Sequence, residues 1–222
     1  SVGIASSSYT TSVINTVIYN NNARGLKVVD GAGVDIVNSI IKNNVSSADL
    51  VEIEIGSNAT ASIRYSMIPN GQNAINSDGT LTWGSGNIDV DPMFVDTANG
   101  NYHLLASSML INAGHPDSTD SDGTRADIGA YPYLNTYSGP MWFVSGNGND
   151  TTATGEGSNS FRSIQAAINF ASDGDEVNVA SGHYFENINF RGRAIVVKGT
   201  GNSIIDGGGN GTVVTFESGE DT

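Results

Sequence analysis

Short clusters of valine and isoleucine alternate along the chain with runs of asparagine, serine, threonine and glycine. Apolar clusters bounded by turn formers at short intervals are typical of many short β-strands. The pattern therefore predicts an all-β protein. One segment differs: in residues 161–172, Ile164, Ala167, Ile168 and Ala171 fall on one face of a helix, which predicts a short amphipathic helix there.

The apolar pattern repeats at the spacing of one solenoid coil. Residues 13–21 match residues 36–44 at an offset of 23, and residues 63–71 follow at a further offset of 27. Repeats of this length predict parallel coils that stack about 4.8 Å apart through main-chain hydrogen bonds. The equivalent apolar residues should form a core stripe, namely Val17, Ile40 and Met67.

Asparagine recurs at the turn that ends each repeat, at positions 20, 43 and 70. Asparagine tolerates the left-handed backbone conformation, and equivalent asparagines in stacked coils can pair with each other. We expect Asn20, Asn43 and Asn70 to form one structural ladder rather than a ligand site.

The first half also carries family motifs. Residues 86–96, 101–104, 111–114 and 127–131 resemble the closing segment of secreted bacterial and archaeal right-handed parallel β-helix proteins, the pectate-lyase-like solenoids. The resemblance covers about residues 10–135 and implies right-handed parallel β-helix coils in an extracellular or cell-surface protein.

The second half resembles the opening segment of the same family, through residues 142–150, 161–168, 174–177, 181–184 and 204–209. The resemblance implies that the helix at 161–172 caps the first coil. The order of the segments is inverted, with closing-type coils in residues 1–138 and opening-type coils in residues 139–222. We therefore expect an unpaired strand edge at each end, which would continue from residues 219–222 of one copy into residues 1–4 of the next.

Charge and composition exclude several classes of partner. The net charge of −14 would repel a phosphate backbone, so we expect no nucleic acid ligand. The chain has no cysteine, so neither disulfides nor thiolate metal sites contribute to its stability. No apolar run approaches the roughly 20 residues that span a bilayer, so we expect no membrane span.

Catalytic signatures are weak, and we expect a protein that is not an enzyme. The sequence has no adjacent Asp-Asp pair, no Gly-His-Gly and no Arg-Ile-Lys of the kind that polygalacturonase-like sites use. Arg191, Arg193 and Lys198 fit a solvent-facing strand edge better than a lyase base, and Asp206 fits a turn. The histidines at 103, 115 and 183 are far apart in sequence, so a zinc triad has little support.

An acidic loop is the one metal candidate. Asp117, Asp120 and Asp122, with Asp127 after them, gather carboxylates around Gly123, as a structural calcium ion requires. The alternative is an acidic loop without a metal. Asp89, Asp91 and Asp96 form a weaker second candidate.

Four Asn-x-Ser/Thr sequons leave glycosylation open; they begin at Asn44, Asn58, Asn149 and Asn210.

The sequence thus predicts a structural subunit or repeat of an extracellular filament or cell-surface stalk, with the protein itself as its main partner. The C-terminal coils of one copy would stack on the N-terminal coils of the next. The alternative is a β-helix that binds or cleaves surface polysaccharide on a groove lined by Tyr19, Tyr65 and Trp83.

Overall fold

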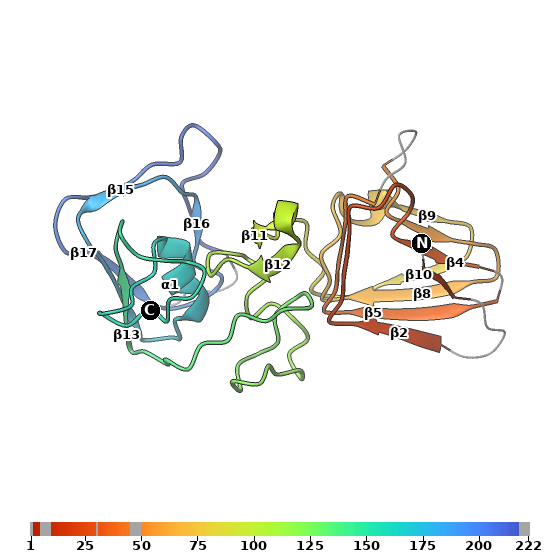
Figure 1. Ribbon diagram of the computed structural model, residues 1–222, viewed down its shortest axis with the longest axis horizontal. Helices are drawn as coiled ribbons and strands as arrows, with labels where there is room; N and C mark the ends of the chain where they lie inside the picture. Colours follow the sequence, from red (N-terminus) through yellow and green to blue (C-terminus); the bar gives the residue numbers. More distant parts are fainter. Residues whose placement is uncertain (1, 5–9, 30, 45–49, 218–222) are drawn as a thin grey trace. The chain divides into compact units, whose positions relative to one another are not determined.

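The computed structural model describes residues 2–4, 10–29, 31–44 and 50–217. It is an all-β parallel solenoid, and its described residues contain one α-helix, so the predicted fold class is confirmed (Figure 1). The chain divides into two compact units. The first combines residues 1–92 with 112–132, and the second combines residues 93–111 with 133–222.

The strands of the first unit form three parallel stacks. One stack holds β1 (Val2–Ile4), β4 (Leu26–Val28), β7 (Ile53–Ile55) and β9 (Ile75–Ser77); the second holds β2 (Thr10–Ile14), β5 (Gly33–Val37), β8 (Thr60–Arg64) and β10 (Thr80–Trp83); the third holds β3 (Val17–Tyr19) and β6 (Ile40–Lys42). A 3-10 helix, Gly71–Ala74, precedes β9. The first two coils therefore contribute a strand to each stack, and the next two continue the third stack through single bridges at Met67 and Ile88.

The register of these strands follows the sequence repeat. Val13 pairs with Ile36, and Ile36 pairs with Ile63, which are the predicted offsets of 23 and 27. Ile40 likewise pairs with Val17 on one side and bridges to Met67 on the other. The repeats are confirmed as successive coils.

The interior of the first unit is a column of aliphatic side chains. Residues that share the inward face of β4, β5, β7 and β8 are fully or almost fully buried: Leu26, Val28, Val34, Ile36, Ile53, Ile55, Ala61 and Ile63. In the third stack the inward residues are Ile18, Ile41 and Ile68. These inward side chains are shielded from water only where a neighbouring coil packs on them.

The predicted stripe of Val17, Ile40 and Met67 lies outside the interior column. Ile40 and Met67 are fully buried, but neither belongs to the interior column. Gly129 lies against Ile40 and Val17, and a β-carbon there would come within 3.0 Å of Ile40 Cδ1. Ile40 and Val17 are therefore covered from outside the coil by the segment that contains Gly129.

The turn asparagines adopt the expected backbone conformation. Asn20, Asn43 and Asn70 have φ values of 56°, 59° and 59°. The hydrogen-bonded ladder, however, lies at the neighbouring turn, where Thr16 N–H donates to Ser39 Oγ and Ser39 N–H donates to Ser66 Oγ. Small hydroxyl residues thus link successive coils at the turn between the second and third strands.

The second unit contains the remaining strands. Three parallel stacks hold β13 (Met141–Val144), β14 (Glu176–Val179) and β17 (Val196–Gly199); β15 (Gly182–Tyr184) and β18 (Ser203–Ile205); and β16 (Ile188–Asn189) and β19 (Val214–Thr215). An antiparallel hairpin, β11 (Phe94–Asp96) and β12 (Asn101–Leu104), flanks a 3-10 helix at Thr97–Asn99.

The predicted helix is α1, Ile164–Phe170, and it is shorter than the predicted 161–172. Ser163 begins it as the N-cap, because its side chain accepts a hydrogen bond from Ala166 N–H. Ile164, Ala167 and Ile168 are buried in the core of the unit, and α1 packs against β13, β14 and β16. Figure 1 shows the helix beside β13 and β16. The helix therefore covers the core at the β13 side of this unit.

Arg191 and Arg193 do not lie along a solvent-facing strand edge. Arg191 donates to Ile111 O at 2.9 Å and to Asn169 Oδ1 at 2.9 Å, and Arg193 donates to Asn169 O at 3.1 Å. Asn169 Nδ2 in turn donates to the carbonyls of Ala106 and Ser108. These groups join the C-terminal end of α1 to residues 93–111, which explains why that segment packs within the second unit.

Candidate functional site

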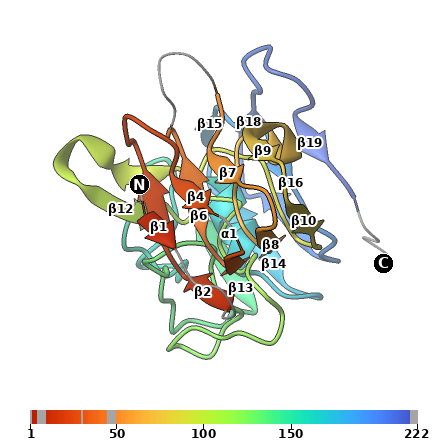
Figure 2. The ribbon, with the colours of Figure 1, turned by 90° about the vertical axis from the view of Figure 1, so that its right-hand side faces the viewer.

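The first exposed strand edge lies on the first unit. Within the described residues β1, β2 and β3 each have a strand neighbour on one side. Figure 2 shows β1 beside its neighbour β4. The inward side chains Val13 and Ile18 are half-buried, whereas their neighbours Ile36 and Ile41 in the next coil are fully buried. With Val17 and Leu26 they line an open groove of about 710 Å³. We call β1–β3 the N-edge.

The second exposed edge, the C-edge, consists of β17, β18 and β19 on the second unit. Each has a neighbour on one side among the described residues. Val197, Ile205 and Val214 pack against the core but remain half-buried. Beside them Val196, Ile204 and Phe216 are 56%, 54% and 63% exposed. Both edges thus leave the end of an apolar core incompletely covered.

Main-chain groups on both edges point outward. Asn15 N–H donates to Val37 O, so alternate residues of β2 bond to β5, and the N–H groups of Ser12 and Ile14 face the free side. Val196 N–H donates to Asp175 O, so the N–H of Val197 faces the free side of β17. Such groups are templates for pairing with another strand.

Within the described strands, the two edges carry few of the features that prevent such pairing, apart from the shortness of the strands and one lysine. Proteins block exposed edges with proline, charge or bulges. In the six edge strands, Lys198 is the one charged residue and proline does not occur. Lys198 lies 3.5 Å from Glu176 of the neighbouring strand. The edges are therefore chemically suited to strand addition.

The acidic loop uses its carboxylates to close its own turns. Asp122 Oδ1 accepts from Thr124 N–H and Thr124 Oγ1, and Asp120 Oδ2 accepts from Asp127 N–H at 2.9 Å. Asp127 is buried and accepts from Asn112 N–H, whereas Asp117 is exposed. Burial raises the pKa of Asp120, an effect that the Asp127 N–H opposes and the nearby Asp122 carboxylate reinforces.

The four aspartates do not converge on one point. Within the described ranges, no three histidine, cysteine, aspartate or glutamate side chains lie together in a way that would hold a metal ion. The second acidic candidate is also dispersed. Asp89 accepts from Asn70 N–H, Asp91 lies 3.7 Å from Lys42 Nζ, and Asp96 is the N-cap of the 3-10 helix at Thr97–Asn99.

The three histidines have separate partners. His103 Nδ1 lies 2.9 Å from Asn101 Oδ1, the His115 ring packs edge-on against Tyr65, and His183 Nε2 lies 3.0 Å from Asp206 Oδ2. Asp206 also accepts from Gly208 N–H, as expected of a turn residue.

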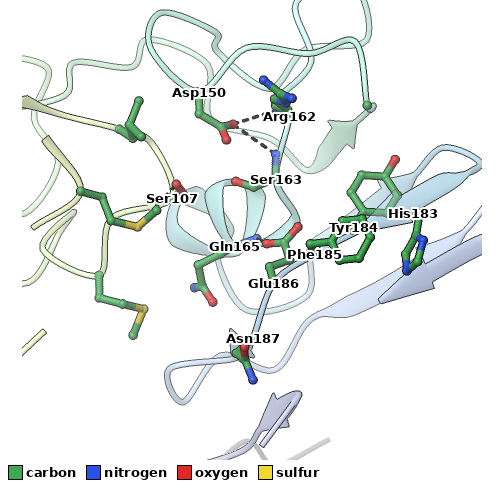
Figure 3. A pocket seen from close by; sticks show the side chains of 14 residues that line it. Ser107, Asp150, Arg162, Ser163, Gln165, His183, Tyr184, Phe185, Glu186 and Asn187 are labelled. Carbon is green, nitrogen blue, oxygen red and sulfur yellow. Dashed lines mark hydrogen bonds between the residues drawn. The ribbon is translucent and has the colours of Figure 1, made fainter. Parts of the chain in front are cut away.

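A pocket of about 580 Å³ in the second unit was not predicted from the sequence (Figure 3). Its polar wall comes from Asp150, Arg162 and Glu186. Its lining also includes Phe185, a residue that is 72% exposed and whose ring lies against His183. No sequence motif marks this pocket, because its residues come from five separated segments of the chain.

The carboxylates of the pocket accept hydrogen bonds from main-chain N–H groups at the start of α1. Asp150 Oδ1 accepts from Arg162 and Ser163 N–H, and Glu186 accepts from Ile164 and Gln165 N–H at 2.8 and 3.0 Å (Figure 3). Burial raises the pKa of Glu186, although those two N–H groups partly oppose the effect. Both side chains thus satisfy the main-chain donors that a helix leaves unpaired at its start.

The aromatic residues expected to line a polysaccharide groove are partly engaged elsewhere. Tyr65 contacts His115 and lies beneath the Arg125 guanidinium, at 5.7 Å from the ring centre. Trp83 packs against the core of the first unit, and the Tyr19 hydroxyl accepts from Asn43 Nδ2.

The sequons differ in accessibility. Asn44 is fully buried, and its Nδ2 donates to Ile18 O at 2.7 Å, so a glycan on this nitrogen is incompatible with the folded coil. The serine of that sequon, Ser46, lies outside the described residues. Asn58, Asn149 and Asn210 are exposed.

Comparison of the chain with protein family models, characterised proteins and solved structures finds no match. Within the described ranges, no helix has the length and apolar character needed to cross a membrane.

Proposed function

We propose that this chain is a non-enzymatic structural subunit, or one repeat, of an extracellular filament or cell-surface stalk. The C-edge of one copy stacks on the N-edge of the next, so that parallel ladders run through successive copies. The observation that supports the proposal is a pair of edges that have no second strand neighbour in the described part of the chain, each with half-buried core side chains and outward main-chain N–H groups.

Stacking would stabilise the assembly through two contributions. Apolar area on Val13, Ile18, Val197 and Ile205 would leave water, at about 25 cal/mol for each Å² buried. The outward N–H and C=O groups would form parallel ladder bonds of the kind already present within each unit. Because the N-edge and the C-edge are different surfaces, such contacts propagate head to tail instead of closing a symmetric dimer.

Composition supports an extracellular structural role. The chain is acidic and resembles secreted parallel β-helix proteins in residues 10–135 and 142–216. The pocket carboxylates Asp150 and Glu186 hold the start of α1, which is a structural rather than a catalytic use. The copies would be separate subunits of 23.0 kDa or repeats of one longer polypeptide, and the mass of dissociated native material separates these forms.

The decisive experiment blocks one edge at a time. Ser12→Pro removes an outward N–H from the N-edge, and Val197→Pro removes one from the C-edge; neither N–H belongs to the existing ladder. We expect the wild-type protein to form fibres visible by electron microscopy, each proline variant to remain monomeric in sedimentation velocity, and their equimolar mixture to stop at dimers.

The matched controls are Ser12→Thr and Val197→Thr, which alter the same side chains but keep the N–H groups. Both should assemble like the wild type. Wild-type protein that stays monomeric at every concentration tested would refute the proposal. So would proline variants that form fibres unaided, or a mixture that contains no dimer.

A further inference from the structure

The inward side chains of the two units follow the same spacing across the tightest turn of the coil. In the first unit β5 ends and β6 begins with Asn38 and Ser39 between them, and the inward residues Ile36 and Ile41 are five positions apart. In the second unit Ala180 and Ser181 separate β14 from β15. The inward residues Val179 and Tyr184 are again five positions apart.

This shared spacing identifies which strands are equivalent. β14 and β17 correspond to β2 and β5, and β15 and β18 correspond to β3 and β6. The lengths of the other connecting segments agree with this correspondence. The short segment 200–202 separates β17 from β18, whereas the longer segment 206–213 separates β18 from β19. At the N-edge, residues 15 and 16 separate β2 from β3, whereas residues 5–9 separate β1 from β2.

The equivalence of the strands also shows which residues of the two edge strands occupy the same inward positions of the coil. Val197 pairs with Val177, Gly199 with Val179, and Ile205 with Tyr184, so these three continue the inward columns of the second unit. On the N-edge Thr11 pairs with Val34, Val13 with Ile36, and Ile18 with Ile41.

Main-chain direction gives an independent check. In the β2–β5 pair and in the β14–β17 pair, the strand that comes first in the chain uses the main-chain N–H and C=O groups of its inward residues. The strand that comes second uses the main-chain groups of its outward residues. On the C-edge the free groups belong to the inward residues Val197 and Gly199, and on the N-edge to the outward residues Ser12 and Ile14. A β17–β2 junction would therefore repeat the bonding of every coil step within the units.

We infer that β17 of one copy stacks on β2 of a second copy and β18 on β3, with Val197 beside Thr11, Gly199 beside Val13 and Ile205 beside Ile18. This inference rests on the proposed head-to-tail assembly and selects one of its three rotational settings. In this setting Ser12 N–H donates to Val197 O, and Val197 N–H donates to Thr10 O. The Ile205 side chain enters the groove formed by Val13, Val17, Ile18 and Leu26.

Disulfide trapping tests the register directly, because the chain contains no cysteine of its own. The register places Lys198 beside Ser12, and both side chains are exposed. Neighbouring strands lie about 4.8 Å apart, within the range that a disulfide spans. The double variant Ser12→Cys/Lys198→Cys, oxidised mildly after assembly, should give a ladder of cross-linked multimers on a non-reducing gel.

Offset pairs are the matched controls. Thr10→Cys/Lys198→Cys and Ile14→Cys/Lys198→Cys shift the register by two residues, which separates the α-carbons by about 8 Å and should reduce cross-linking about tenfold. Tyr19→Cys/Lys198→Cys tests the setting in which β17 lies on β3. Single-cysteine variants should not cross-link with themselves.

The possible outcomes separate the two proposals. Multimers from the Ser12/Lys198 pair alone support the inferred register. Fibres that cross-link best through Thr10, Ile14 or Tyr19 overturn the register and leave the proposed function standing. Absence of assembly in the wild-type protein overturns both.

Discussion

At the scale of single residues, carboxylates in this protein mainly satisfy main-chain donors. Asp120 accepts from Asp127 N–H, Asp127 from Asn112 N–H, and Asp122 from Thr124 N–H. An asparagine side chain also supplies an oxygen acceptor, so Asp→Asn substitutions separate charge from hydrogen bonding at these positions. The calcium site expected at Asp117, Asp120, Asp122 and Asp127 remains a prediction, and such substitutions can test it.

The first prediction concerns Asp120. Its pKa is raised mainly by burial, so the folded state disfavours its ionised form at neutral pH. In chelator, Asp120→Asn should therefore melt slightly above the wild type by circular dichroism. If the loop binds calcium, added calcium should raise the melting temperature of the wild type and not that of the variant.

Asp117→Asn is the control, because Asp117 is exposed. In chelator it should melt with the wild type. Equal responses of wild type and Asp120→Asn to calcium would remove the metal from the loop, and a lower melting temperature of Asp120→Asn in chelator would contradict the burial argument.

At the scale of elements, α1 depends on side chains from outside the helix. It spans Ile164–Phe170, and isolated helices of this length are unstable in water. Glu186 and Asp150 accept from the N–H groups at its start, and Arg193 donates to Asn169 O near its end. The apolar face of the helix was predictable from the sequence, but these end contacts come from distant segments and were not.

The second prediction concerns Glu186. Its pKa is raised above 4.5, so the stability linked to its proton is fully present below pH 4.5 and is lost as the pH rises through the raised value. Glu186→Gln should remove this part of the pH dependence, measured by urea unfolding above pH 4.5. Glu186→Ala, which leaves two N–H groups without acceptors, should cost about 1–2 kcal/mol at neutral pH.

Glu156→Ala is the control, because Glu156 is an exposed glutamate in the same unit. It should change the unfolding free energy by less than about 0.5 kcal/mol. A pH profile of Glu186→Gln that is identical to the wild-type profile would show that Glu186 does not titrate in the expected sense.

At the scale of the whole molecule, the described part of each unit ends in strands that have a neighbour on one side only, and we expect these strands to limit its stability. In a repeat protein each coil is stabilised by its neighbours, so terminal coils are the weakest unless a cap or a partner covers them. α1 covers the β13 side of the second unit, whereas β17–β19 and β1–β3 have no second strand neighbour among the described residues.

The third prediction follows from mass action. A partner that binds only the folded state raises the melting temperature as its concentration rises. The wild-type protein should therefore melt at higher temperature as its own concentration is increased, measured by calorimetry at several concentrations. Ser12→Pro should show no such dependence, whereas Ser12→Thr should follow the wild type. A wild-type melting temperature that is independent of concentration would contradict self-association.

The local features of this protein follow from short stretches of its amino-acid sequence. The offsets of 23 and 27 predicted which strands stack, since equivalent positions must share the inward face. The spacing of Ile164, Ala167 and Ile168 predicted α1, and Asn20, Asn43 and Asn70 predicted left-handed turns, because few other residues tolerate that conformation. These features depend on periodicity and backbone preference, which are properties of short segments.

Contacts between segments that are distant in the chain could be seen only in the tertiary structure. The ladder through Ser39 and Ser66, the outer cover of Ile40 by Gly129, and the packing of residues 93–111 beside α1 each join positions far apart in the chain. The sequence also predicted unpaired edges, but which main-chain groups face outward, and hence which register could continue the solenoid, required the observed hydrogen bonds. Such contacts depend on how the coils are placed in space, and no local pattern encodes that placement.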